Sequence, residues 1–281
     1  MIDSANSDPN HGEWLGVLML SSRAAPKEQF PPLINSKVSD VYHRWFEVIP
    51  ADTPALREKA YRLRYQVYCC ENQYEAPEEH LKKMETDAFD CRSIHSLIID
   101  RANGMAIGTV RLILPEPESH ETNFPIQQIC SHPLPAKLPV SGTAEISRFA
   151  ISKKLRKLAD GDCPQNLKCS VVLGLMKAIV QMSWKYGITD WLAVMEPSLL
   201  RLLRRFGIYF APVGPVVEYH GVRQPCHANV DRMLERVREE NLDLWEFATE
   251  SQVLWNEEKT CCADTRIAGV SAAAAVKMVR Y

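Results

Sequence analysis

The sequence lacks the cysteine and histidine patterns that mark metal or redox proteins. No C-x-x-C pair occurs among its nine cysteines, so neither a zinc ribbon nor a redox dithiol has support. The number is odd, and the adjacent pairs Cys69-Cys70 and Cys261-Cys262 have a poor geometry for disulfides. The eight histidines share no metal-ligand spacing. We therefore expect no bound metal and a reducing, cytoplasmic location.

Long apolar runs and a large net charge are missing too. No stretch approaches the roughly 20 apolar residues of a membrane span. The apolar segment 14–20 follows three acidic residues and no Lys or Arg, so we expect no signal peptide. A formal net charge of -2 argues against non-specific nucleic-acid binding. With 281 residues and 46% hydrophobic content, the chain is typical of a soluble globular protein.

The order of the expected elements predicts an α/β fold, with a mixed sheet flanked by helices. Strands are expected at 44–50, 95–100, 106–114, 142–152 and 188–195, and around 209–214 and 216–221. Helices are expected at 53–70, 167–187 and 196–207, with a single turn near 78–84. The helix between strands 142–152 and 188–195 implies that these two strands are parallel neighbours. We divide the chain into an N-terminal arm (1–40), one domain (41–230) and a C-terminal helical extension (231–281).

Residues 61–90 combine arginines, aromatics and carboxylates without forming a clean amphipathic helix. They belong to an ordered pattern, R-x-x-V-Y from Arg64, then Tyr74, then E-x-D-x-x-D from Glu85 to Asp90. The pattern continues with "RLIL" from Arg111 and "EISRF" from Glu145. This ordered set resembles the acyl-homoserine lactone (autoinducer) synthases, which have the GNAT fold.

Two features depart from that family and point to a related group. Tyr74 stands where tryptophan is usual in the region that holds S-adenosylmethionine, and the chain is longer at both ends. The segments "LRYQVYCCENQYE", "AEISRFAISKKLRK" and "GPVVEYHGVRQPCHANVD" are more similar to PEP-CTERM/exosortase system-associated acyltransferases. These enzymes in turn resemble long-chain N-acyl amino acid synthases. The resemblance implies transfer of a fatty acyl chain from a thioester to an amine.

Acyl transfer to an amine needs a base, donors for an oxyanion and an apolar slot for the chain. Glu145 lies among apolar neighbours on a strand, where burial would raise its pKa and suit it to act as the base. Strand alternation places Ser147 and Phe149 on its face, with Ile146 and Arg148 on the other. A bulge in this strand would change that arrangement and free backbone N–H groups. We expect catalytic roles for Glu145, Ser147 and Arg148.

Residues 71–92 are acidic and irregular and are called the acidic loop. This loop is expected to fold back over the helix that carries Arg64. We expect Arg64 and Arg148 to pair with Asp87, Asp90 and Glu145, and Tyr68 and Tyr74 to form walls of a pocket for a small zwitterionic acceptor. The expected substrate-binding residues are Arg64, Tyr68, Tyr74, Glu85, Asp87, Asp90, Arg111 and Phe149.

The donor is expected to be an acyl carrier protein rather than coenzyme A. Coenzyme A acetyltransferases usually carry a Gly-rich loop for the pyrophosphate, and none occurs between Leu155 and Gly174. Acyl carrier protein is acidic and suits basic patches. The candidate contacts are Lys153, Lys154, Arg156, Lys157, Arg201, Arg204 and Arg205. We expect no permanently bound cofactor, with the acyl-phosphopantetheine thioester as co-substrate. The alternatives are an acyl-homoserine lactone synthase that uses S-adenosylmethionine and a non-catalytic acyl-binding protein.

Overall fold

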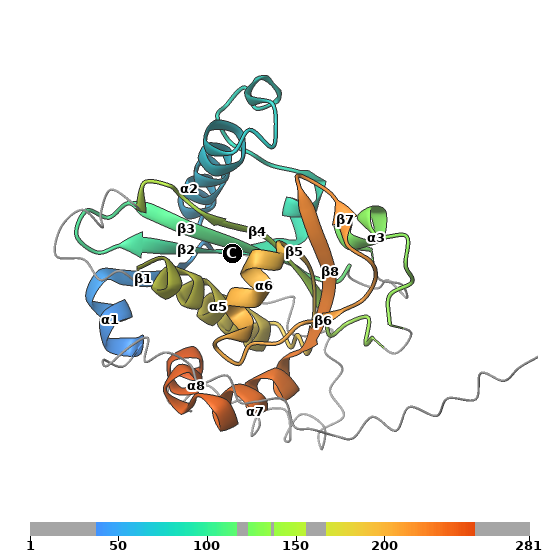
Figure 1. The fold of residues 1–281 in the computed structure, drawn as a ribbon. Coiled ribbons are helices and arrows are strands. Elements are labelled where there is room, and N and C mark those ends of the chain that lie inside the picture. The colour runs from blue at the N-terminus through green and yellow to red at the C-terminus, as the bar shows by residue number, and fades with distance from the viewer. Residues whose placement is uncertain (1–37, 117–122, 136–137, 156–166, 251–281) are drawn as a thin grey trace, which may run out of the picture. The chain divides into compact units, whose positions relative to one another are not determined.

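The computed structural model describes residues 38–116, 123–135, 138–155 and 167–250, all within one compact unit of the chain. Within these residues the strands form an eight-stranded mixed sheet of order β1-β2-β3-β4-β5-β8-β6, and β7 pairs with β8 (Figure 1). The strands are β1 (Phe46–Pro50), β2 (Ser93–Asp100), β3 (Ala106–Ile113), β4 (Thr143–Ile151), β5 (Asp190–Met195), β6 (Ala211–Pro212), β7 (Val217–Glu218) and β8 (Val222–Asn229). The predicted fold class is confirmed.

Helices flank this sheet on both faces (Figure 1). The α-helices are α1 (Val38–Trp45), α2 (Pro54–Tyr65), α3 (Pro125–Ile129), α5 (Leu167–Lys185), α6 (Pro197–Arg204), α7 (Val230–Glu240) and α8 (Leu242–Thr249). A π-helix (Gln66–Glu71) continues α2, and short 3-10 helices lie at Pro77–Glu79 and Ala88–Arg92. The first helical turn of the acidic loop, Pro77–Glu79, overlaps only the start of the turn expected near 78–84.

Alternation along β2 explains how α2 and α5 come to occupy opposite faces. Leu97 and Ile99 belong to the small apolar cluster that α2 completes with Ala60, whereas Ile98 belongs to the main core. That main core contains most of α5 and also the buried side chains of α7 and α8. The helices after residue 230 thus share one hydrophobic core with the central sheet.

The helix α5 has the length and apolar composition to cross a membrane. Its apolar window is, however, 78% buried inside the fold. Burial of this kind is typical of a core helix in a globular domain, and it accounts for the unbroken run of apolar residues from Val171 to Leu173.

Local chemistry produces the elements that position the site. Thr53 caps α2 by accepting a hydrogen bond from the Leu56 N–H (3.3 Å). The turn containing Asn103-Gly104 joins β2 to β3 as an antiparallel hairpin. β4 and β5 are parallel, as expected for strands joined through α5. The predicted single helix over 53–70 is wrong in one respect, because α2 ends at Tyr65 and the π-helix follows.

Candidate active site

A cavity of about 650 Å³ lies where β4 and β5 separate. The two strands pair only from Thr143 to Ile146 on β4 and from Asp190 to Ala193 on β5. Residues 145–153 line the cavity from β4 and the turn after it. Apolar side chains make up much of its wall, namely Phe149, Ile151, Leu155, Leu167, Val172, Val194, Met195, Leu199 and Leu202. The cavity therefore offers a long apolar surface beside an unpaired strand edge.

A β-bulge interrupts β4 in the cavity wall. Arg111 of β3 lies opposite Ser147, whereas Thr109 lies opposite Ala150, so β4 holds one extra residue. Arg148 takes up the irregularity with a φ of 50°, a conformation uncommon outside glycine. The expected alternation of Glu145, Ser147 and Phe149 against Ile146 and Arg148 is therefore broken at Arg148. The sequence predicts this change of alternation only if the strand contains a bulge, and the structure has one.

Glu145 is buried in β4 and contributes to the cavity wall. Its Oε2 accepts a hydrogen bond from the backbone N–H of Ile126 in α3 (2.9 Å). Burial raises the pKa of Glu145 to about 8, because the hydrogen bond from Ile126 offsets only part of the desolvation. A carboxyl group with this pKa changes protonation near neutral pH, as a general base requires.

The expected pairing of Glu145 with an arginine is wrong. No ion pair joins Glu145 to Arg64 or Arg148 in the described part of the chain. Its partner, Ile126, lies on α3, in a segment for which the sequence predicts no site residue. Burial, with no ion pair to offset it, keeps the pKa of Glu145 high.

Arg64 is fully buried beneath the acidic loop. Its Nε donates to Glu85, and its Nη1 and Nη2 donate to the two carboxylate oxygens of Asp90 at 2.7 and 3.0 Å. The fork of donors in an arginine suits such bidentate pairing. The loop therefore folds back over α2, as the sequence predicted.

Arg111 and Arg148 complete this buried network of charges. Nη1 of Arg111 donates to Asp87 (2.6 Å) and Asp90 (2.9 Å), and its Nε donates to the Ser147 hydroxyl (2.8 Å). Nη2 of Arg148 donates to Glu85 (2.8 Å) and Asp87 (3.0 Å). The network thus links the acidic loop to both sides of the bulge.

Two carboxylates of this network, Glu85 and Asp90, remain ionised. Burial of Glu85 would raise its pKa, but hydrogen bonds from Arg64 and Arg148 outweigh it and lower the pKa to about 2. Burial opposes ionisation of Asp90 as well, yet hydrogen bonds from Arg64 hold its pKa well below the usual range. Glu85 and Asp90 are therefore structural anions, in contrast to Glu145.

The cavity wall includes only part of the expected substrate-binding set. Tyr68, Tyr74, Arg111 and Phe149 line it, together with Glu145, Ser147 and Arg148. Arg64, Glu85, Asp87 and Asp90 are not among the lining residues. Glu85, Asp87 and Asp90 instead pair with Arg111 and Arg148, and Arg64 pairs with Glu85 and Asp90.

Two aromatic rings form one wall of the cavity. Tyr68 and Tyr74 meet edge to face with centroids 6.0 Å apart, and the Arg148 guanidinium lies 5.3 Å from the Tyr68 ring. Sequence reasoning missed the neighbours of Tyr74, which are His220 at 5.7 Å and Arg223 at 5.8 Å. Both lie in the segment "EYHGVRQ", whose resemblance to the related acyltransferases was the available signal.

The expected basic contacts divide into two groups. Arg201, Arg204 and Arg205 on and after α6 are exposed, and no ion pair engages them among the described residues. Lys153 and Lys154 are tied to the π-helix, where Lys154 Nζ donates to Gln66 (3.0 Å) and the Lys153 N–H donates to Glu71 (2.7 Å). Arg156 and Lys157 lie outside the described residues.

Residues 63–160 match the acetyltransferase (GNAT) domain family. Among solved structures, TofI in a ternary complex with an inhibitor and MTA is 21% identical with a TM-score of 0.51, covering 68% of this chain and 96% of that one. The AHL synthase LasI is 21% identical with a TM-score of 0.48, covering 65% and 88%. FeeM, an N-acyl amino acid synthase from uncultured soil microbes, is 12% identical with a TM-score of 0.47, covering 68% and 94%. No curated protein matches the chain.

The matched segment and the likeness to TofI together show that this part of the chain has the GNAT acetyltransferase fold. The matched domain extends from α2 through β4 and so contains Arg64, the acidic loop, Arg111, Glu145 and the bulge. The fold is that of TofI.

Proposed function

We propose that the chain is an N-acyltransferase that moves a fatty acyl chain from an acyl carrier protein thioester to the amine of a small acceptor such as an amino acid. The observation that carries this proposal is the position of Glu145. It is a buried carboxyl group with a pKa of about 8, in the wall of a largely apolar cavity and next to the unpaired edge of β4.

Each requirement of the reaction has a candidate in this cavity. The acceptor's ammonium group first loses one proton to solvent, and the free amine nitrogen attacks the thioester carbonyl carbon. Glu145 takes the second proton as the C–N bond forms and gives it to the thiolate that leaves. Backbone N–H groups of β4 beyond Ile146, which have no partner on β5, are placed to donate to the oxyanion. The apolar wall accommodates the acyl chain.

The acceptor pocket is proposed at the end of the cavity formed by Tyr68, Tyr74, Arg111 and Arg148. Guanidinium groups favour a carboxylate, and aromatic faces favour an ammonium group. An amino acid carries both groups, which supports a zwitterionic acceptor. The resemblance to N-acyl amino acid synthases and exosortase-associated acyltransferases supports the same class.

The proposed donor is acyl-phosphopantetheine on an acyl carrier protein, in the cytoplasm and without a resident cofactor. Ser198, Leu199 and Leu202 of α6 line the cavity, and the exposed Arg201, Arg204 and Arg205 lie on and just after this helix. An acidic carrier that docks on these cations would deliver its thioester beside β4. The missing Gly-rich loop disfavours a pyrophosphate-bearing donor.

An acyl-homoserine lactone synthase that uses S-adenosylmethionine is the second candidate. The ordered set from Arg64 to Arg148 favours it, since the charged and aromatic members of the set are joined in one network or line one cavity. Tyr74, in place of the usual tryptophan, argues for a different acceptor.

The product of the reaction separates these functions. The full chain is incubated with a long-chain acyl carrier protein and either a pool of amino acids or S-adenosylmethionine, and products are identified by mass spectrometry. N-acyl amino acids are expected. Acyl-homoserine lactone as the main product would replace the proposal with the second candidate, and the absence of both would refute acyl transfer to these amines.

A further inference from the structure

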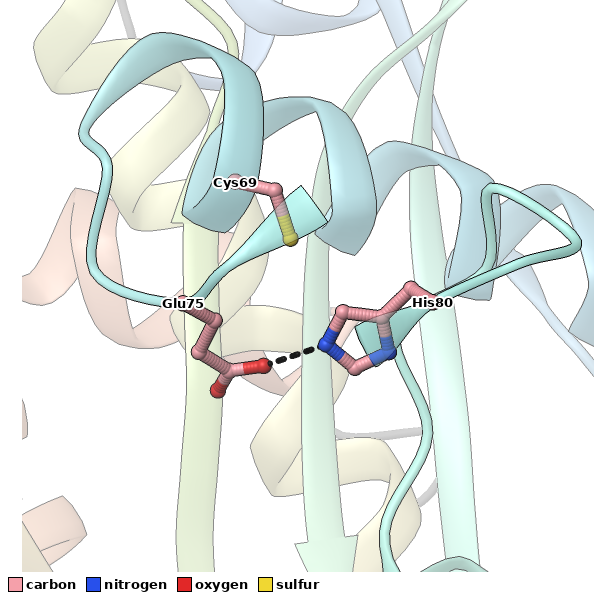
Figure 2. Close-up of side chains that lie close together, drawn as sticks. All are labelled: Cys69, Glu75 and His80. Carbon is pink, nitrogen blue, oxygen red and sulfur yellow. Dashed lines mark hydrogen bonds and ion pairs between the residues drawn. The ribbon is translucent and has the colours of Figure 1, made fainter. Parts of the chain in front are cut away.

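We propose that Cys69, Glu75 and His80 form a binding site for one zinc-like divalent cation, independent of the acyl-transfer proposal. One atom from each side chain, a thiol sulfur, a carboxylate oxygen and an imidazole nitrogen, lies within 4.8 Å of the other two. Figure 2 shows all three side chains directed into one space between the helix and the loop that follows it. The expectation of no metal, made from cysteine and histidine spacing, is thereby replaced with a proposal.

Separate segments of chain bring the three groups together. Cys69 lies in the π-helix Gln66–Glu71, a rare element that is frequent at functional sites. Glu75 lies in the loop after it, and His80 follows the 3-10 helix Pro77–Glu79. The backbone N–H of Tyr74 donates to the Tyr68 carbonyl (2.8 Å), which fixes Glu75 close to the π-helix.

The donor set selects the class of cation. Thiolate, imidazole and carboxylate together are typical ligands of zinc, whereas magnesium and calcium prefer oxygen alone. Bonds of about 2.0–2.3 Å to a tetrahedral ion place ligand atoms roughly 3.3–3.7 Å apart. Ligand atoms that lie within 4.8 Å of one another would therefore have to approach by up to roughly 1.5 Å on binding the ion. Three protein ligands leave a fourth position for water.

Charge and access also suit a cation. His80 Nε2 and Glu75 Oε2 are 2.9 Å apart, so the ion would replace this one hydrogen bond. Glu79 adds negative charge near the Cys69 sulfur. Cys69 is buried, whereas the side chains of His80 and Glu75 are 11% and 17% exposed, which gives the ion a route from solvent.

The proposed cation would stabilise one wall of the cavity. Tyr68 and Tyr74, the two aromatic wall residues, directly precede Cys69 and Glu75 in the sequence. The other carboxylate oxygen of Glu75 lies 3.5 Å from Arg148. An ion held here would therefore join the two segments that carry the tyrosines and fix the position of a group next to the bulge.

The test uses cobalt as a spectroscopic probe of the full chain. The parent protein for this test carries the substitutions Cys261→Ser and Cys262→Ser. One equivalent of Co²⁺ is expected to bind with a thiolate charge-transfer band, and Zn²⁺ is expected to displace it. Cys69→Ser should abolish the band. His80→Gln, at a partly exposed position where misfolding is not expected, should weaken the affinity for cobalt by at least roughly 10-fold. Loss of a residue that only supports a metal ligand already costs about 10–100-fold in metal affinity.

The matched control is Cys70→Ser, because Cys70 is adjacent but exposed. This variant should keep the stoichiometry and the band. The proposal is overturned if the parent protein binds no cobalt, if the band survives in Cys69→Ser, if His80→Gln binds as tightly as the parent, or if Cys70→Ser loses binding equally. None of these readings depends on acyl transfer.

Discussion

At the scale of single residues, three carboxyl groups within one domain have opposite protonation behaviour because their partners differ. Glu85 and Asp90 are buried against arginines, and their pKa values fall. Glu145 is buried against a single backbone N–H, and its pKa rises to about 8. Glu145 is thus the group suited to exchange a proton near neutral pH, while the other two hold arginines in place.

Arg64 provides the residue-scale test of the network. Arg64→Ala removes one of the two arginine partners of both Asp90 and Glu85 in a buried site, which is expected to cost about 3–5 kcal/mol in the free energy of unfolding. Arg64→Lys keeps the charge but loses the planar fork, so it should restore only part of the loss. Denaturant unfolding of both variants measures these costs.

Arg62 is the matched control, two residues away on α2. It is exposed and paired with Glu58 one turn earlier, so Arg62→Ala should cost no more than about 1 kcal/mol. Equal losses for Arg62→Ala and Arg64→Ala would show that the buried network contributes nothing beyond an ordinary surface arginine.

At the scale of elements, α5 is fitted to α1 through Gly174. A Cβ atom at Gly174 would lie within 3 Å of the Tyr42 ring and hydroxyl. Gly174→Ala should gain about 1 kcal/mol of helix propensity but lose about 1–3 kcal/mol from overpacking. We expect a net loss of stability, seen as a lower melting temperature. A higher melting temperature would show that α1 moves aside without cost.

Elements set by local chemistry were predictable from the sequence. Thr53 caps α2, and the Asn103-Gly104 turn forms the β2–β3 hairpin, because each depends on residues adjacent in the chain. β8 was missed. It contains Pro225, which argues against a central strand, yet it pairs with β5 on one side and with β6 on the other.

The contacts of the candidate site also divide into those that the sequence predicts and those that depend on the tertiary fold. The pairing of the acidic loop with Arg64 was predictable, because the loop follows the helix of Arg64 closely in the sequence and carries the opposite charge. The contact of Glu145 with Ile126 did not, because α3 reaches β4 only through the tertiary fold. The bulge at Arg148 depends on the register with β3, which the β4 sequence alone does not specify.

At the scale of the whole molecule, the net charge of -2 does not reveal the local cluster of cations, Arg201, Arg204 and Arg205, on and just after α6. Charge reversal of Arg204 and Arg205 to Glu should weaken use of an acyl carrier protein more than use of a short thioester mimic. The difference should shrink as salt rises, because exposed charges act through screened attraction. Steady-state rates with both donors at two ionic strengths provide the measurement, and an equal loss with both donors would assign the arginines a structural role.

The central claim is that Glu145 serves as the base for acylation of an amine. The most direct measurement is the rate of N-acyl product formation by the parent chain and by Glu145→Gln, from about pH 6 to about pH 9. Glutamine keeps the acceptor for the Ile126 N–H, so the fold should persist, but it cannot take a proton. Because the base must be ionised, the parent rate should rise with pH through about 8, and the variant should be slower by roughly 10²–10⁴-fold. A near-normal rate for Glu145→Gln across this range would contradict the account.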